Sequence, residues 1–269
     1  MRSDEDSMKD VDRKKLRALG KEAGKYAVEN KSRLRIDRRD KYNTSTDIEK
    51  DLSEFYESRL RQIIDVPVLT EENSSPKVNS NISEFWLVDS IDGTLSYVNG
   101  FLSYVTQFAH ICDGVAIYGL VYAPEYDDLY EGIFQFGAFK NGIKIQSDYR
   151  SEFTTIVDNT RTPNKIVKSL MDDFGIANYV MSGSIGLKLC LVADGQADLF
   201  VKLNSLEAWD VAPAALVLKE AGGFACNVDG SNFINEVGIK TKGILGARNT
   251  KKELIEAVQA RIQVSYEAE

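Results

Sequence analysis

Two turn dipeptides, Asp113-Gly114 and Asn141-Gly142, separate short apolar runs and constrain the fold of this chain more than any other feature. Such dipeptides between apolar runs are typical of tight β-hairpins, because both of their positions tolerate a positive φ. The strands that this pattern predicts cover residues 85–88, 106–112, 116–123, 129–134, 138–139 and 143–145. We therefore expect a mainly antiparallel sheet in the first half, with helices over residues 16–30 and 47–64 packed against it.

The second half of the chain alternates apolar runs of helical length with runs of strand length. The expected helices cover residues 164–174, 185–194, 209–221 and 251–262, and the expected strands cover residues 155–158, 199–201, 224–228 and 244–247. A polar stretch near residues 146–151 separates the halves. We therefore predict an N-terminal α+β subdomain over residues 1–148 and a C-terminal α/β subdomain over residues 149–269, within one compact unit. The fold class is α/β (α+β).

The composition argues against several classes of partner. The 269 residues carry a net charge of −8, which disfavours a nucleic-acid surface and binding to anionic membranes. No apolar run is long enough to cross a bilayer, and residues 1–15 lack the apolar core of a signal peptide. The three cysteines lie far apart in apolar surroundings, which fits buried thiols in a reducing compartment. We expect a cytoplasmic protein.

Residues 89–94, with the sequence Asp-Ser-Ile-Asp-Gly-Thr, directly follow the expected strand at residues 85–88. A strand that ends in this way can place Asp89 and Asp92 near one point, and Gly93 permits backbone geometry that a Cβ would obstruct. Paired carboxylates with free backbone N–H groups suit a hard divalent cation and a phosphate bridged onto it. A surface turn is the alternative, because Asp, Ser, Gly and Thr are all common in turns.

Two further acidic residues could belong to the same site. Asp210 lies at the start of the helix expected over residues 209–221, where a carboxylate is also a common helix cap. Glu71 follows an apolar run. The alternative to a ligand role is that Glu71 is simply solvent-exposed, as most glutamates are. Mg²⁺ prefers carboxylate oxygens and retained water, whereas zinc-like metals take histidine or thiolate ligands. A set of acidic residues therefore favours Mg²⁺. His110 is the single histidine, and we expect it to be structural.

Taken together, Glu71-Glu72, residues 89–94 and Trp209-Asp210 with the ending Gly222-Gly223 resemble the inositol monophosphatase superfamily of Mg²⁺-dependent, lithium-sensitive phosphomonoesterases. The resemblance extends from about residue 47 to about residue 223. It implies the sugar-phosphatase fold, with layers in the order α/β/α/β/α and two or three Mg²⁺ ions between the subdomains. The metal ligands that it implies are Glu71, Asp89, the Ile91 carbonyl, Asp92 and Asp210.

The same resemblance implies the groups that act on the substrate. Asp47 matches a family aspartate that pairs with the threonine of the Asp-Gly-Thr sequence. Asp47 and Thr94 would therefore orient and activate the attacking water, with Glu71 as a further catalytic group. The amides of Gly93 and Thr94 would hold the transferred phosphoryl group, and Asp210 is also assigned to the substrate site.

Substrate choice depends on residues of the second half. Lys202 stands where inositol monophosphatases usually carry a glutamate that contacts inositol, and the loop over residues 198–209 is one residue longer. These features resemble the 3′(2′),5′-bisphosphate nucleotidases, as does the glycine-rich element with Gly183, Ser184 and Lys188. A second phosphate needs positive charge or helix N-terminal amides, which these four residues could supply. Packing glycines and solvated lysines are the alternative.

The most specific function that the sequence predicts is hydrolysis of the 3′-phosphate of 3′-phosphoadenosine 5′-phosphate, a small-molecule phosphate monoester. Residues 95–96, Leu-Ser, match neither subgroup closely, so inositol 1-phosphate stays open as the substrate, with fructose 1,6-bisphosphate more remote. A non-catalytic binding or regulatory protein on the same fold is the alternative from another class. Monomer and homodimer both stay open.

Overall fold

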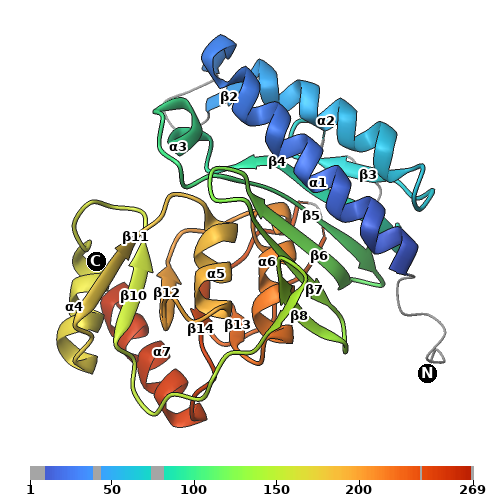
Figure 1. Cartoon of the computed structure of the whole chain (residues 1–269). Coiled ribbons are helices and arrows are strands. Elements are labelled where there is room, and N and C mark those ends of the chain that lie inside the picture. The colour runs from blue at the N-terminus through green and yellow to red at the C-terminus, as the bar shows by residue number, and fades with distance from the viewer. Residues whose placement is uncertain (1–9, 39–43, 74–81, 237, 268–269) are drawn as a thin grey trace.

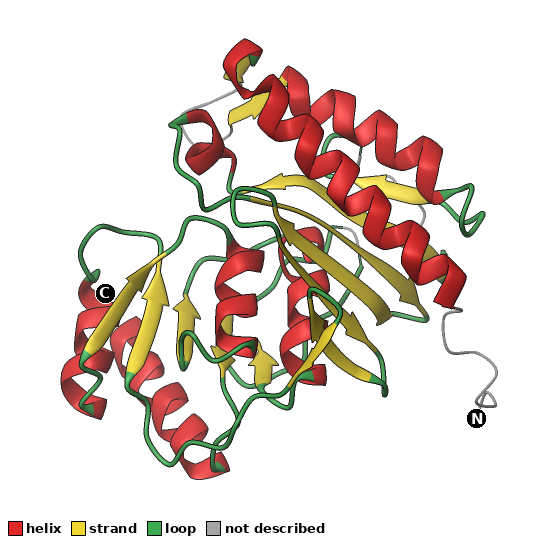
Figure 2. Ribbon diagram, viewed as in Figure 1, coloured by secondary structure: helices red, strands yellow, loops and turns green. Residues whose placement is uncertain are grey.

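The computed structural model describes residues 10–38, 44–73, 82–236 and 238–267. Within these ranges the elements stack as helix, sheet, helix, sheet and helix layers (Figures 1 and 2). The α/β class and the order of layers that the resemblance implied are therefore confirmed. Most of residues 1–15, which bear on the question of a signal peptide, lie outside the described residues.

The longer helices form three of the five layers. They are α1 (Asp10–Asn30), α2 (Asp47–Leu60), α4 (Lys165–Phe174), α5 (Ile185–Ala193), α6 (Ala208–Glu220) and α7 (Lys252–Glu267). In Figure 1, α1 and α2 cover the outer face of the larger sheet, α5 and α6 lie between the sheets, and α4 and α7 cover the smaller sheet. No helix in the described ranges combines the length and the apolarity that crossing a membrane requires.

The larger sheet has seven strands in the order β3-β4-β5-β6-β7-β8-β9. They are β3 (Val68–Thr70), β4 (Glu84–Asp92), β5 (Val105–Cys112), β6 (Val115–Ala123), β7 (Asp128–Ile133), β8 (Gly137–Lys140) and β9 (Ile143–Ile145). All neighbouring pairs are antiparallel except β3 and β4. Asp113 and Asn141 have φ values of 50° and 51°, and each precedes a glycine with positive φ, so both predicted hairpin turns are confirmed.

Strand β4 continues past residue 88, where the sequence predicted its end, and reaches Asp92. It is buried from Phe85 to Asp92 because α2 and α6 pack near it from opposite layers. The register between β4 and β5 shifts between Asp89 and Asp92. A bulge of this kind bends a strand and re-aims its side chains. Both carboxylates are thereby carried into the interior of the molecule.

The smaller sheet has the strand order β11-β10-β12-β14-β13. Its strands are β10 (Thr155–Asp158), β11 (Asn178–Met181), β12 (Leu199–Lys202), β13 (Phe224–Cys226) and β14 (Ile244–Ala247). Strand β11 was not predicted, because it is an edge strand whose residues are exposed or half-buried. The other unpredicted elements are short: η2 (Lys31–Arg33), β1 (Ile36–Arg38), β2 (Thr44–Thr46), β3 (Val68–Thr70) and α3 (Thr94–Val98).

Helix α6 packs directly on the backbone of the larger sheet. A Cβ at Gly119 would lie 2.5 Å from Pro213 O, and a Cβ at Gly132 would lie 2.6 Å from Val217 N. The two glycines therefore allow a close approach that any side chain would prevent. This packing places the first turn of α6, which carries Asp210, beside β4 and β5.

The two halves of the chain share a hydrophobic core. One cluster of buried residues includes Val105 and Val121 from the larger sheet and Phe200 and Ile244 from the smaller sheet. The segment between β9 and β10 coincides with the boundary expected from the sequence. Because the core crosses this boundary, the division into subdomains 1–148 and 149–269 stays a prediction.

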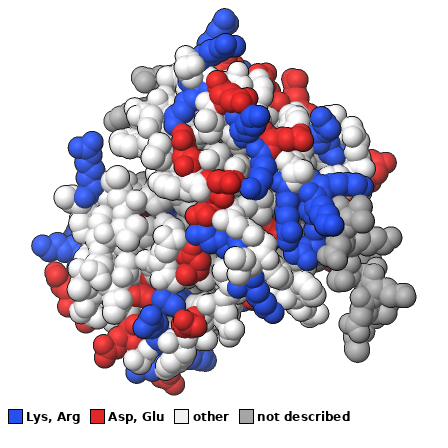
Figure 3. Space-filling view, in the orientation of Figure 1, with Lys and Arg blue, Asp and Glu red and all other residues white. Residues whose placement is uncertain are grey.

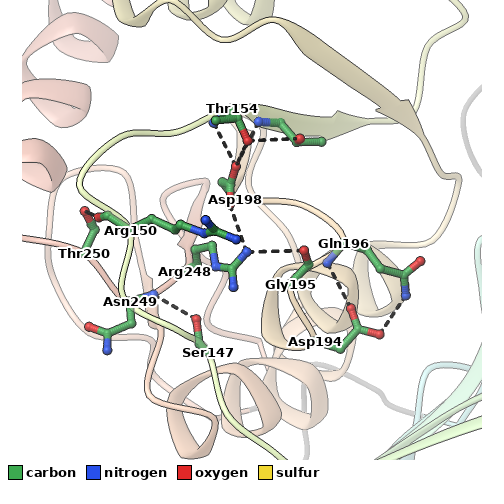
Figure 4. Close-up of polar contacts among 11 residues, drawn as sticks. Ser147, Arg150, Thr154, Asp194, Gly195, Gln196, Asp198, Arg248, Asn249 and Thr250 are labelled. Carbon is green, nitrogen blue, oxygen red and sulfur yellow. Dashed lines mark hydrogen bonds and ion pairs between the residues drawn. The ribbon is translucent and has the colours of Figure 1, made fainter.

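A buried ion pair fixes the start of β12, far from the bulge in β4 along the sequence. Arg248 Nη1 lies 3.2 Å from Asp198 Oδ1 and also donates to Gly195 O, while Asp198 Oδ2 accepts from the amide and hydroxyl of Thr154 (Figure 4). Both charged side chains are buried. Although burial acts in the opposite direction, these donors hold the pKa of the Asp198 carboxyl below its ordinary value.

Candidate functional site

Asp89 lies at the bulge of β4 and is almost completely buried, with 1% of its surface exposed. Its Oδ1 atom is buried and has no hydrogen-bond partner among the described residues. A buried carboxylate oxygen without a donor is costly unless a cation neutralises it. Asp89 is therefore the side chain of this structure that most clearly fits a positively charged ligand.

Four carboxylates interact electrostatically at this end of β4. Burial raises the pKa of the Asp89 carboxyl, and the negative charges of Glu71, Asp92 and Asp210 raise it further. Burial followed by the charge of Asp92 likewise raises the pKa of Asp210 to about 7. These mutual effects require the four groups to lie near one another. The four acidic ligands that the resemblance implied thus come from β4, the end of β3 and the start of α6.

The donor set suits a hard cation that keeps part of its water. Carboxylate and carbonyl oxygens with open positions are what Mg²⁺ prefers. As the side chains stand in the described part of the chain, no three or more acidic, histidine or cysteine residues converge closely enough to hold a metal ion. The fit for a cation therefore rests on the unpaired Asp89 oxygen and on the electrostatic coupling of the carboxylates.

The N-terminus of α5 holds Asp92, which differs from the prediction for this element. Ser184 Oγ donates to Asp92 Oδ2 over 2.5 Å, and the amide of Gly186 donates to the same oxygen over 2.6 Å. The amides of Gly183 and Ser184 donate instead to the side chain and carbonyl of Ser103. The prediction that Gly183 and Ser184 supply free amides to a second phosphate is therefore corrected: their donors are engaged, and they position a carboxylate.

Asp210 is the third residue of α6, and its Oδ2 accepts from the amide of Glu207 over 2.9 Å. Pro213 has no N–H to offer to the carbonyl of Trp209, one turn earlier in the helix. Gln107 Nε2 on β5 donates to Trp209 O over 3.1 Å and to Asp210 O over 3.2 Å. Gln107 thus fixes the turn that carries Asp210. The sequence signalled the need for a donor through Pro213 but not the donor itself.

Thr94 pairs with Glu49 and not with Asp47. Thr94 Oγ1 donates to Glu49 Oε1 over 2.7 Å and lies 3.3 Å from the carbonyl oxygen of Ile91. Asp47 Oδ1 accepts from the amide of Arg35 over 2.7 Å. The pairing that the resemblance assigned to Asp47 is therefore corrected, because the first residue of α2 turns toward the preceding strand region while the third residue turns toward Thr94.

Glu71 follows β3 at the edge of the site. Its amide donates to Val88 O over 3.2 Å, which ties the residue to β4, and its side chain is exposed. The neighbouring Glu72 accepts from Ser90 Oγ over 3.2 Å. Glu71 is therefore the most accessible of the four acidic residues predicted as ligands, whereas Asp89 and Asp92 on β4 are buried.

The two lysines predicted to contact substrate occupy different environments. Lys188 is fully buried: its Nζ donates to Gly183 O over 3.3 Å and lies 4.9 Å from the centroid of the Phe200 ring. Burial, followed by the charge of Lys202, lowers the pKa of Lys188 to about 8. Lys188 therefore does not reach a substrate surface in this structure, and the prediction of a direct contact is corrected for this residue.

Lys202 lines a groove of about 550 Å³ at the ends of β10 and β12. Asn159, Asn164 and Asn204 are among the polar side chains of its wall. The positive charge of Lys202 also lowers the pKa of Asp210, against the larger effect of burial. Lys202 therefore connects the acidic site with a groove that is rich in hydrogen-bonding amides.

Comparison with known proteins gives a consistent result. Residues 4–263 match the model of the inositol monophosphatase family. Inositol monophosphatase 1 of Bos taurus is 30% identical over 192 residues, which cover 66% of each chain. Inositol monophosphatase 2 of Solanum lycopersicum is 34% identical over 157 residues, covering 55% of this chain and 59% of that protein. The chain thus spans less than two thirds of that relative's length.

A relative with another substrate in its name is similar to a comparable extent. The 3′(2′),5′-bisphosphate nucleotidase CysQ of Haemophilus influenzae is 29% identical over 182 residues, covering 64% of this chain and 67% of that protein. Among solved structures, an IMPase/NADP phosphatase complexed with NADP and Ca²⁺ superposes with a TM-score of 0.80, at 22% identity, over 93% of this chain and 94% of that one. That similarity identifies the fold.

Proposed function

This chain belongs to the inositol monophosphatase family, and we propose that it is a Mg²⁺-dependent phosphoric monoester hydrolase. The single observation that carries the proposal is the buried, unpaired oxygen of Asp89 among the charges of Glu71, Asp92 and Asp210. When bound, the cations supply the positive charge that the anionic phosphoryl group requires in its transition state. Their number, two or three, is part of the proposal.

Residues of the chain would hold the cations, bind the phosphoryl group and orient the attacking water. Glu71, Asp89, the Ile91 carbonyl, Asp92 and Asp210 would hold the cations. The amides of Gly93 and Thr94 stand at the start of α3, where helix N–H groups have no acceptor within the helix, and would bind the phosphoryl oxygens. The Thr94 hydroxyl would orient the attacking water.

We further propose that the substrate carries a second anionic group and is a 3′(2′),5′-bisphosphate nucleotide. Lys202 supports this, because its charge lies between the acidic site and a groove large enough for a substrate fragment. The similarity to a bisphosphate nucleotidase adds support. Basic and acidic side chains intermingle on the face shown in Figure 3, which fits a small-molecule substrate better than a nucleic acid.

Inositol 1-phosphate is the second candidate, because several relatives are named inositol monophosphatases. The test is phosphate release from 3′-phosphoadenosine 5′-phosphate and from inositol 1-phosphate, side by side, with Mg²⁺ and with or without lithium. We expect faster release from the nucleotide and inhibition by lithium. Preference for inositol 1-phosphate would reject the nucleotide proposal, and release from neither would favour a non-catalytic protein.

A further inference from the structure

Glu49 uses both oxygens of a buried carboxylate to join two elements. Its Oε2 accepts from the amide of Thr46, the residue that caps α2, and its Oε1 accepts from Thr94 Oγ1 over 2.7 Å. Only 3% of Glu49 is exposed. The first contact belongs to a capping box, in which a glutamate at the third helical position returns to the cap residue.

Capping alone does not account for this environment. A capping-box glutamate needs one acceptor oxygen and ordinarily lies at the surface, where its charge is hydrated. Burial raises the pKa of the Glu49 carboxyl, so the inward position has a cost. The second oxygen meets a hydroxyl 45 residues away, directly after the predicted metal ligand Asp92 and Gly93. The inward position therefore serves a contact with the candidate site.

The contact fixes the direction of one proton. A threonine hydroxyl has a single proton to donate and two lone pairs that can accept. Glu49 Oε1, at 2.7 Å, is a nearer acceptor for the Thr94 proton than Ile91 O, at 3.3 Å. With the proton directed to Glu49, a lone pair of Thr94 Oγ1 is left to accept from a water molecule. Asp47 does not make this contact, since its Oδ1 accepts from the amide of Arg35.

We propose that Glu49 is the positioning residue that orients the Thr94 hydroxyl toward the attacking water, in the place that the family resemblance gives to Asp47. This inference rests on the proposed phosphatase function. Glu49 would act through Thr94, because its two oxygens are engaged by the amide of Thr46 and the hydroxyl of Thr94. Burial raises the pKa of the Glu49 carboxyl, while the hydrogen bonds from Thr94 and Thr46 act in the opposite direction and favour the ionised form.

The decisive variant is Glu49→Gln. Glutamine has one acceptor oxygen in place of two, so it can satisfy the Thr46 amide or the Thr94 hydroxyl but not both. Asp47→Asn is the rival variant on the same helix, and Glu54→Gln removes an exposed charge from it as a control. The readouts are kcat and KM, the melting temperature, and Mg²⁺-dependent binding of phosphate and of orthovanadate by calorimetry.

We expect Glu49→Gln to lower kcat about 100-fold with little change in KM. Binding of orthovanadate, which can take a fifth oxygen at the position of the attacking water, should weaken more than binding of phosphate. The double variant Glu49→Gln with Thr94→Ala should be no slower than Thr94→Ala alone, because both changes disrupt the same hydrogen-bonded pair. Asp47→Asn should lower kcat far less than Glu49→Gln, because Asp47 Oδ1 contacts the amide of Arg35 and not Thr94. Glu54→Gln changes an exposed position and should leave kcat close to that of the wild type.

Two other results overturn the inference. A Glu49→Gln variant that melts at a lower temperature but keeps its kcat would mean that Glu49 is only a helix cap. A large loss of kcat in Asp47→Asn, with Glu49→Gln unaffected, would return the role to Asp47. If the wild-type protein neither releases phosphate nor binds it with Mg²⁺, the proposed function fails and this inference fails with it.

Discussion

Ser184 Oγ and Asp92 Oδ2 lie 2.5 Å apart, and this hydrogen bond joins the start of α5 to the end of β4. The same Ser184 oxygen accepts from the amide of Leu187, so one hydroxyl both caps a helix and orients a predicted metal ligand. Ser184 is therefore one of the residues through which the two halves of the chain meet at the candidate site.

Ser184→Ala tests this double role. The variant should weaken Mg²⁺ binding about tenfold, since partners that orient a metal ligand contribute to affinity. It should also lose about 1 kcal/mol of unfolding free energy with the helix cap. Calorimetric titration with Mg²⁺ and urea unfolding measure the two effects. Asn164→Ala removes the cap of α4 and is the control: it should lower stability without changing Mg²⁺ affinity.

Gln107→Leu should destabilise the first turn of α6. The change leaves Trp209 O without the donor that Pro213 cannot provide, and a buried unpaired carbonyl costs about 1–3 kcal/mol. Pro213→Ala restores a backbone N–H that can donate to Trp209 O, so Gln107→Leu should lower the free energy of unfolding by less in that background. Urea unfolding of the four proteins gives the coupling. Equal costs in both backgrounds would show that Gln107 does not compensate for the proline.

Lys202→Met tests the proposed second anionic site. It should raise KM for 3′-phosphoadenosine 5′-phosphate by about 10- to 100-fold, as expected when a hydrogen bond to a charged group worth about 1.5–3 kcal/mol is lost. It should leave KM for adenosine 3′-monophosphate almost unchanged. Lys168→Met, an exposed position on α4, is the control. If both substrates respond equally to Lys202→Met, the lysine does not recognise the second phosphate.

Asp198→Asn should destabilise the smaller sheet in a pH-dependent way. Removing one charge of the buried pair leaves Arg248 unpaired, which costs about 3–5 kcal/mol at neutral pH. The pKa of Asp198 is lowered in the folded state, so its contribution is present above the unfolded-state pKa and is lost as the pH falls through the folded pKa.

Urea unfolding at several pH values measures that contribution. The difference between the wild type and Asp198→Asn should be largest near neutral pH and should shrink in acid. Asp229→Asn is the comparison, because Asp229 is paired with Lys242 at the surface and should contribute far less. A difference that grows as the pH falls would contradict this account of Asp198.

Local signals predicted much of the fold. Asp113-Gly114 and Asn141-Gly142 determine hairpins within a few residues, and α4, β10 and β14 have bounds at or next to the predicted ones. Strand β11 carries only three consecutive apolar residues, at positions 179–181, a weak signal for a strand, and its position depends on pairing with β10. Such pairing depends on residues far away in the chain and leaves no local signal.

The candidate site shows the same division between local and distant information. The spacing of Asp89, Asp92 and Gly93 is local, and the structure places the two aspartates at one bulge. Which carboxylate contacts Thr94 depends on how α2 approaches β4, and the sequence does not show that approach. The match to the family sequence pattern therefore favoured Asp47 over Glu49.

Distant contacts also decide the role of the α5 start. The amides there satisfy Asp92 and Ser103, which a glycine-rich sequence next to a helix cannot reveal. Bound phosphate and a buried carboxylate present the same chemistry to helix amides, so the residue types alone could not distinguish them.

Phosphate release by the wild type and by Asp89→Asn is the measurement that tests the proposed Mg²⁺ site around Asp89. With 3′-phosphoadenosine 5′-phosphate and Mg²⁺, the wild type should release phosphate, and removal of Mg²⁺ should abolish release. Asp89→Asn should fold and release phosphate more than about 100-fold more slowly, since loss of a ligand should exceed the loss of an orienting partner. Wild-type turnover in Asp89→Asn would contradict the account.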